Sequence, residues 1–272
     1  LQSPWELNSN WNSTDNRPES IQLRFQTAGI EGAINGTVNP WQSQSLFYID
    51  GINITALVLQ YTGSGYESAP YSGSTYSTSY QYANLTFYPD ITNPTSTASI
   101  YLPFYDGGWW SVMVNKSGNT FTLYAGNKLY YDGYDGNQIG FLASSSITQA
   151  TNAWVYGSDA YLSNTLTING ETYSPLNGYF QELRYWSKTG SVEAFKDFIM
   201  NPSSIDYWGD ENEYANYLAF RHPLGNELYG ITISNNQYFL TNYKSIHPKI
   251  TGSWAITQSF YDDTSYFIGE NE

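Results

Sequence analysis

The carboxylates of this chain are the first groups that could do chemistry. Glycoside hydrolysis needs two carboxyl groups on either side of the scissile bond, about 5–9 Å apart. The nearest carboxylate on a predicted core strand is Glu182, and Arg184 follows two positions later. Residues two apart in a strand point to the same side of the sheet, so this spacing favours an ion pair over a catalytic dyad. We therefore name no catalytic residue from the sequence.

The histidines and cysteines offer little more. Only two histidines occur, His222 and His247, and the chain has no cysteine. A disulfide framework and a cysteine metal site are therefore excluded, and a histidine-rich zinc site has few ligands to draw on. A lyase could use tyrosine and histidine in place of paired carboxylates, so His247, which lies near Lys244 and Lys249, keeps that reaction open.

A glycine-rich segment supplies oxygen ligands of the kind that calcium prefers. Asp132 and Asp135 lie in the run DGYDGN, and Asp106 lies just before a pair of tryptophans. Carboxylate and carbonyl oxygens on loops suit this hard cation. The spacing does not match the twelve-residue EF-hand loop, and a plain Asp-Gly turn is the competing interpretation. The calcium ligands that we predict are Asp132, Asp135 and Asp106.

Aromatic residues could bind sugars by stacking on the apolar faces of the rings. They make up 18% of the chain, with 27 Tyr, 13 Phe and 9 Trp. Trp109 and Trp110 occupy opposite faces of one predicted strand, and the apolar Val112 and Val114 assign Trp110 to the core. Trp109 then either stacks on a ligand or lies beneath the C-terminal segment. The other predicted ligand-binding residues are Tyr66, Tyr71, Tyr76, Tyr130, Tyr131 and Tyr134.

Charge and composition limit the partners. The net charge is −14, only 10 residues are Lys or Arg, and charged residues make up 12% of the chain. Nucleic acid is excluded as a partner because phosphate binding needs basic clusters. Membrane insertion is excluded because no apolar run approaches the length of a transmembrane helix. An acidic surface rich in Tyr, Ser, Gly and Asn suits a neutral partner such as a polysaccharide.

The elements that must position these residues are mostly strands. Period-two alternation predicts an antiparallel meander from Asp106 to Leu142, with turns at 115–119 and at Gly126-Asn127 and a third strand beginning at 128–131. Residues 62–81 lack apolar periodicity and read as a long exposed loop. Helical periodicity predicts one helix over 191–200, capped by Ser191. Further strands are predicted at 21–26, 45–50, 56–61, 83–88, 99–105, 153–156, 161–169 and 178–186, with an Asn169-Gly170 turn.

The chain divides into three parts. Residues 1–20 form a polar N-terminal arm, residues 21–209 the main domain, and residues 210–272 a β-rich extension that begins at an acidic run. Asn-x-Ser/Thr sequons, which are compatible with glycosylation but do not establish it, occur at Asn12, Asn35, Asn53, Asn84 and Asn115.

The order of motifs resembles a known family. WWSVMV, a turn, TFTLYAGNKLY, GxIGF and GYFQELRYWS followed by a short amphipathic helix are similar to laminin G-like domains, of the concanavalin A-like lectin/glucanase class, over residues 21–200. The later runs LAFRxPLGNELY and SIHPKITGSWAITQSF resemble the extension that follows such domains in virion proteins of large DNA viruses and phages.

The resemblance implies an all-β, two-sheet antiparallel jelly-roll sandwich with one short helix and a small C-terminal β-rich extension. It also implies carbohydrate or protein ligands, sometimes with calcium. The E-x-D-x-x-E strand of the glucanase branch is absent here. We therefore expect a non-enzymatic, lectin-like attachment module of a virion or exported surface protein, bound to a glycan or host cell-surface polysaccharide. The alternatives are a structural or protein–protein spacer that contacts other virion proteins, and a cell-wall polysaccharide-degrading enzyme.

Overall fold

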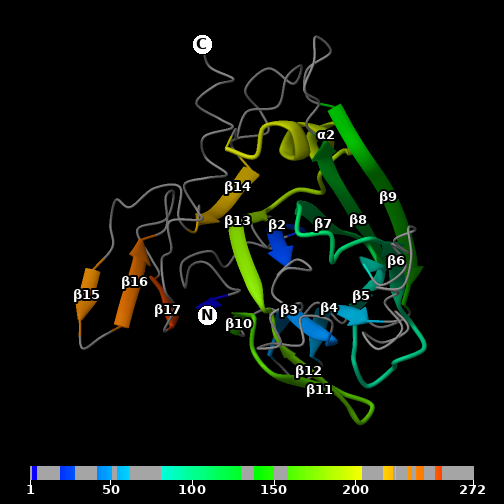
Figure 1. Ribbon diagram of the computed structural model, residues 1–272, viewed down its shortest axis with the longest axis horizontal. Coiled ribbons are helices and arrows are strands. Elements are labelled where there is room, and N and C mark those ends of the chain that lie inside the picture. Colours follow the sequence, from blue (N-terminus) through cyan, green and yellow to red (C-terminus); the bar gives the residue numbers. More distant parts are fainter. Residues whose placement is uncertain are drawn as a thin grey trace, which may run out of the picture.

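The protein is a two-sheet β-sandwich (Figure 1). The computed structural model describes residues 2–4, 19–27, 42–50, 54–61, 81–129, 138–149, 159–203, 217–222, 224, 232–234, 237–241 and 249–252. Within these residues there are two sheets and one helix, which confirms the predicted fold class of an all-β jelly-roll sandwich. None of the described helices is both long and apolar enough to cross a membrane.

The larger sheet has eleven strands, and its main path runs β15-β16-β17-β1-β10-β3-β4-β5-β6. A hairpin of β11 and β12 joins it through a short parallel pairing of β12 with β3. The bounds are Gln2–Pro4 (β1), Gln44–Ile49 (β3), Thr55–Tyr61 (β4), Ala83–Tyr88 (β5), Ala98–Leu102 (β6), Asp159–Leu162 (β10), Leu166–Ile168 (β11), Glu171–Pro175 (β12), Thr232–Ser234 (β15), Gln237–Thr241 (β16) and Lys249–Gly252 (β17).

The smaller sheet has six strands in the order β14-β13-β2-β7-β8-β9, and all of its pairings are antiparallel. We refer to it as the six-stranded sheet. The bounds are Ser20–Thr27 (β2), Trp109–Ser117 (β7), Thr120–Leu129 (β8), Gln138–Thr148 (β9), Gly178–Trp186 (β13) and Leu218–His222 (β14).

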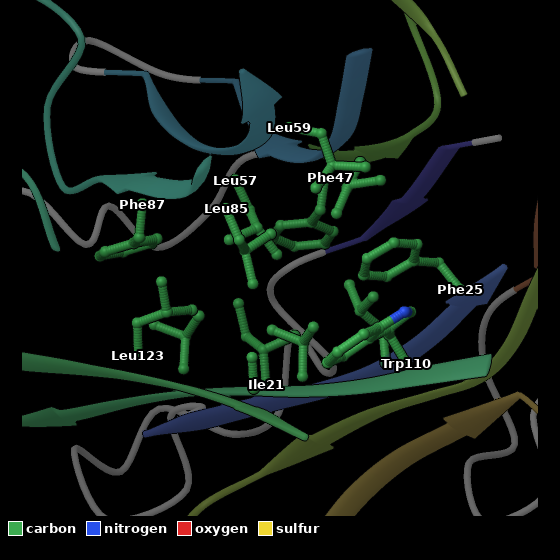
Figure 2. Close-up of a cluster of buried hydrophobic side chains, with 14 of the residues drawn as sticks. Ile21, Phe25, Phe47, Leu57, Leu59, Leu85, Phe87, Trp110 and Leu123 are labelled. Carbon is green, nitrogen blue, oxygen red and sulfur yellow. The ribbon is translucent and has the colours of Figure 1, made fainter. Parts of the chain in front are cut away.

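The core lies between the two sheets and follows from period-two alternation in the strands. Figure 2 shows Phe47, Leu57 and Leu85 of the larger sheet facing Phe25 and Trp110 of the six-stranded sheet. Trp110 is fully buried, as its alternation with Val112 and Val114 predicts. Away from the bulges in β3 and β8, alternate residues of β2 to β8 therefore point outward, and these outward residues form the two outer faces of the sandwich.

One predicted turn is wrong. Gly126 and Asn127 do not reverse the chain, because β8 continues through them to Leu129. Asn127 instead lies at a bulge, where its side-chain oxygen accepts a hydrogen bond from the backbone N–H of Phe141 at 2.9 Å. The third strand of the meander is β9, Gln138–Thr148, which begins beyond the predicted start at 128–131 and runs past Leu142 through a serine-rich segment.

Helix α2, Val192–Met200, packs on the outer face of the six-stranded sheet. Ser191 caps its N-terminus, as predicted, by accepting a hydrogen bond from the backbone N–H of Ala194. The glycine at 126 has a packing role here: a Cβ atom at this position would lie 2.4 Å from Cδ1 of Ile199. Phe195 and Ile199 are buried against the sheet, where Phe195 packs with Met113 and Tyr124.

A β-hairpin covers part of the outer face of the larger sheet. The predicted Asn169-Gly170 turn is confirmed, and both residues have positive φ angles, of 49° and 83°. Leu166, Ile168 and Tyr173 of the hairpin pack on Val58 and neighbouring residues to form a second, smaller apolar cluster.

The division of the chain into three parts stays a prediction. Gln2–Pro4 of the predicted arm pairs with β10, and β14 of the predicted extension pairs with β13. The predicted strand at 153–156 lies outside the described residues.

Candidate functional site

The outer face of the six-stranded sheet contains a buried ion-pair cluster. A β-bulge in β13 places Glu182 at a φ of 54°, on the same side of the sheet as Arg184. Nε of Arg184 donates to Oε2 of Glu182 at 2.9 Å. Arg221 of β14 donates to both carboxylate oxygens, from Nη2 at 2.7 Å and from Nε at 2.9 Å. The predicted ion pair is thus confirmed, and it has a second arginine that sequence spacing did not reveal.

This cluster is sealed from solvent. The side chain of Glu182 is 0% exposed, and the ring of Phe198 from α2 lies 4.8 Å from the guanidinium carbon of Arg184. Arg184 also donates a hydrogen bond to the carbonyl of Pro202 just beyond the helix. Burial by itself raises the pKa of Glu182, but the guanidinium groups of Arg184 and Arg221 more than offset this and hold the pKa below its ordinary value of 4.5. No substrate can reach this carboxylate, so its role is structural.

Trp109 lies on the same outer face, as predicted, and is partly buried. The guanidinium of Arg24 lies 5.2 Å from the centre of the indole, a cation–π contact that covers one face of the ring. Trp109 pairs with Gln26 of β2, whose side-chain amide donates to the carbonyl of Gly107 at 2.6 Å. The contacts of Trp109 therefore tie the start of β7 to β2.

The carboxylate of Asp106 holds the tryptophan loop in place. Its Oδ1 accepts hydrogen bonds from the backbone N–H of Gly108 at 2.8 Å and from Nε1 of Trp110 at 3.0 Å. Burial raises the pKa of Asp106 above its ordinary value of 3.8. One of the two oxygens of this predicted calcium ligand therefore already accepts two hydrogen bonds. Asp132 and Asp135 lie outside the described residues, within which no cluster of three or more potential metal ligands occurs.

The six predicted tyrosine ligands lie outside the described residues: Tyr66, Tyr71, Tyr76, Tyr130, Tyr131 and Tyr134. The first three belong to the segment that connects Tyr61, at the end of β4, to Gln81, just before β5. The strand residues at this end of the larger sheet are therefore of interest for binding.

A row of polar and aromatic side chains crosses the outer face of the larger sheet at this end. Cross-strand pairing places Gln60 of β4 beside Asn84 of β5, and Asn84 beside Tyr101 of β6. Their neighbours Leu59, Leu85 and Ile100 point into the core, so the row points outward. We call this row, with the three residues described next, the Tyr101 surface: Ser43, Gln60, Tyr82, Asn84, Tyr101 and Glu171.

The aromatic end of the Tyr101 surface is open. Tyr101 is 54% exposed, the most exposed large hydrophobic side chain among the described residues. The ring of Tyr82 lies 5.1 Å from it, centre to centre, at an angle of 36°. Among the described residues, none is hydrogen-bonded to the side chain of Asn84 or to the hydroxyl of Tyr101. An exposed ring thus lies next to an amide that can still donate and accept hydrogen bonds.

The other end of the Tyr101 surface is anchored by a carboxylate. The Asn169-Gly170 turn brings Glu171, at the start of β12, over β3 and β4. Its Oε1 accepts a hydrogen bond from Ser43 at 2.9 Å, and its Oε2 accepts from Gln60 at 3.3 Å and from Tyr173 at 3.2 Å. The hydrogen bond from Gln60 fixes the amide that is next to Asn84.

This arrangement fits a sugar. A ring face can stack on Tyr101 or Tyr82, while Asn84 and Gln60 bond to hydroxyl groups around its edge. Sequence reasoning missed the Tyr101 surface, although alternation in the run Ala98–Leu102 already places Tyr101 outward. What the sequence did not reveal is that Tyr82 and Glu171 lie on the same sheet face as Tyr101.

No protein-family model and no curated protein matches the sequence. Among solved structures, the chain is similar to the LG1-3 region of the laminin alpha2 chain, with a TM-score of 0.39 and 10% identity over 71% of this chain and 31% of that one. It is also similar to the CBM40 of Ruminococcus gnavus IT-sialidase bound to alpha2,3 sialyllactose, with a TM-score of 0.39 and 12% identity over 73% and 97%. The tailspike protein 2 of bacteriophage CBA120 gives a TM-score of 0.37 and 9% identity over 76% and 27%. Similarity at this level assigns the chain to no family.

Proposed function

We propose that this protein is a carbohydrate-binding module and that the Tyr101 surface is where it holds its ligand. The observation that carries the proposal is the exposed ring of Tyr101 beside the amide of Asn84, to which no described residue is hydrogen-bonded, on a sheet that fixes both backbones. A binding surface built on strands is preorganised, because only side-chain rotamers remain to be ordered when the ligand arrives. Residues 62–80 carry three of the predicted tyrosines, and the described residues that flank them, Tyr61 and Gln81, adjoin Gln60 and Tyr82 of this surface.

We also propose a setting for the module. It serves as the attachment part of a virion or exported surface protein and engages a glycan or polysaccharide on the host cell surface. The motifs of residues 218–229 and 245–260, which resemble the extension of virion proteins, support this setting.

The test is a glycan array followed by titration calorimetry on the best binder. Tyr101→Ala and Asn84→Ala should each weaken binding by about tenfold, which corresponds to about 1.4 kcal/mol for one lost stacking contact or hydrogen-bonded amide. Thr172→Ala, an exposed change on the hairpin, is the matched control and should bind as the unchanged protein does. An array without binders, or binding that neither variant alters, would overturn the proposal.

A role for calcium stays a prediction that rests on Asp132, Asp135 and Asp106. Because Oδ1 of Asp106 accepts hydrogen bonds from Gly108 and Trp110, this residue would bind the ion through Oδ2. Titration with calcium, measured by calorimetry and by thermal unfolding, tests the site. A rise in melting temperature that Asp132→Asn abolishes supports it, and an unchanged melting temperature refutes it.

A second candidate function, a protein–protein module, is favoured by strand β9. This strand has 11 residues and is the end strand of the six-stranded sheet among the described elements. Charged residues and prolines usually protect sheet edges from pairing with another chain, and the sequence of β9, QIGFLASSSIT, contains neither. Its Leu142 is 40% exposed. Antiparallel pairing of β9 with β9 of a second copy would give a dimer in light scattering that Ser144→Lys dissociates. A monomer at all concentrations would contradict this function.

A further inference from the structure

The charges of the molecule are divided between its two sheets. Every described Lys or Arg except Lys249 lies on the six-stranded sheet, on helix α2 or on the segment that joins them. The described strands β3–β6 and β10–β12 carry none. The sequence alone shows the same division, because no Lys or Arg occurs between Arg24 and Lys116 or between Lys128 and Arg184. Neither stretch can therefore bring a lysine or arginine to the Tyr101 surface.

The charge that the Tyr101 surface does contain is negative. Glu171 is exposed and is oriented by Ser43, Gln60 and Tyr173, all of which donate to it through neutral groups. Proteins hold carboxylates, sulfates and phosphates with arginine, lysine or clustered backbone N–H groups, because charge-assisted hydrogen bonds compensate for the lost hydration of the anion. An acidic sugar on this surface would meet the carboxylate of Glu171 and no positive side chain from the described strands β3–β6 and β10–β12.

We infer that the ligand of the Tyr101 surface is a neutral glycan, composed of hexoses or N-acetylhexosamines without sialic acid, uronic acid or sulfate. This inference rests on the proposed carbohydrate-binding function. Neutral sugars need a stacking ring, here Tyr101 or Tyr82, together with uncharged donors and acceptors, here Asn84 and Gln60. Glu171 adds an acceptor for sugar hydroxyl groups and at the same time repels anionic ones.

The test compares matched pairs of glycans. A panel of neutral oligosaccharides is titrated into the protein, each beside its sialylated or sulfated derivative, such as lactose beside 3′-sialyllactose. For the pairs that bind, we expect the neutral member to bind at least tenfold more tightly at low salt. The ratio of the two dissociation constants, acidic over neutral, should fall by threefold or more in Glu171→Gln. Higher salt should lower it too, because salt screens the repulsion between Glu171 and the anionic sugar. Glu193→Gln removes an exposed carboxylate on α2 and should leave the ratio unchanged.

The outcomes separate this inference from the function on which it rests. Acidic members that bind as tightly as neutral ones, with affinity lost in Tyr101→Ala, would overturn the ligand class and leave the function intact. A ratio that Glu171→Gln does not change would refute the role of this carboxylate. A panel in which neither the neutral nor the acidic members bind would refute the carbohydrate-binding function itself.

Discussion

The polar residues on the outer faces of the two sheets differ in burial and in hydrogen bonding. On the six-stranded sheet, Glu182, Arg184 and Arg221 are closed off from solvent and bonded to one another. On the larger sheet, no described residue is hydrogen-bonded to the side chain of Asn84 or to the hydroxyl of Tyr101, whereas Glu171, at the other end of the Tyr101 surface, accepts hydrogen bonds from Ser43 and Gln60. The first face has a helix packed on it, and the second has a hairpin that stops short of Tyr101.

The difference shows how burial decides what a charged or aromatic residue can do. The sequence predicts an ion pair of Glu182 with Arg184, and burial under α2 together with the second arginine, Arg221, makes this carboxylate a link between β13 and β14. Trp109 looks like a stacking platform, but Arg24 covers one of its faces. Tyr101 draws little attention in the sequence, yet it is the open ring. Each of the following changes therefore alters one face and should leave the other as it is.

The largest effect is expected from Glu182→Gln. The change leaves Arg184 and Arg221 buried without their counterion, and breaking one partner of such a pair costs about 3–5 kcal/mol of unfolding free energy. Urea unfolding measures it. The control Glu193→Gln removes an exposed ion pair to Lys196 at 3.8 Å and should change stability by less than about 0.5 kcal/mol. A loss of unfolding free energy below about 1 kcal/mol for Glu182→Gln would mean that the ion-pair cluster does not stabilise the packing of β13 on β14.

The pH dependence of stability should identify the same carboxylate. The pKa of Glu182 is lowered in the folded state, so its contribution is present above the unfolded value near 4.5 and is lost as the pH falls through the folded value. Asp106 has a raised pKa and acts in the opposite direction, since its proton is bound more tightly in the folded state. Unfolding free energies of the unchanged protein should fall below pH 4.5, and Glu182→Gln should flatten this fall. Equal slopes in the two proteins would contradict the assignment.

A smaller effect is expected where α2 touches the six-stranded sheet. In Gly126→Ala the new Cβ would meet Cδ1 of Ile199 at 2.4 Å and the carbonyl of Phe141 at 2.8 Å. Overpacking of this kind costs about 1–3 kcal/mol. Ile199→Val deletes the Cδ1 atom, so the double variant should be more stable than the sum of the single changes predicts. Strict additivity would show that the helix does not lie on Gly126.

The smallest change in stability is expected at the Tyr101 surface. Tyr101→Ala removes an exposed side chain, so the unfolding free energy should stay within about 0.5 kcal/mol of the unchanged protein. Thermal unfolding measures this. A large loss would mean that Tyr101 is needed for folding and that any loss of binding could not be read as a lost contact.

Local patterns predicted a large part of the fold. Alternation identified Trp110 as core, the Asn169-Gly170 dipeptide identified a hairpin turn, and Ser191 identified the start of α2. These features succeed because each depends on neighbours within a few residues. Gly126-Asn127 misled for the same reason: a Gly-Asn pair favours a turn locally, whereas here the glycine makes room for a helix that follows about 70 residues later.

The candidate site was less accessible from the sequence. The bond from Arg221 to Glu182 joins residues 39 positions apart, and the one from Ser43 to Glu171 joins residues 128 positions apart. No spacing rule reports such contacts, since they follow from strand order. The predicted tyrosines and Asp132 and Asp135 lie outside the described residues and stay predictions.

The most direct measurement compares Tyr101→Ala with Trp109→Ala on one glycan. Both variants remove one aromatic ring from an outer sheet face, and calorimetry gives the dissociation constant of each with the tightest ligand of the unchanged protein. We predict that Tyr101→Ala raises the constant about tenfold or more and that Trp109→Ala leaves it within about twofold, since one good stacking contact is worth about 1 kcal/mol. The reverse result, with binding lost only in Trp109→Ala, would place the ligand on the six-stranded sheet and contradict the account.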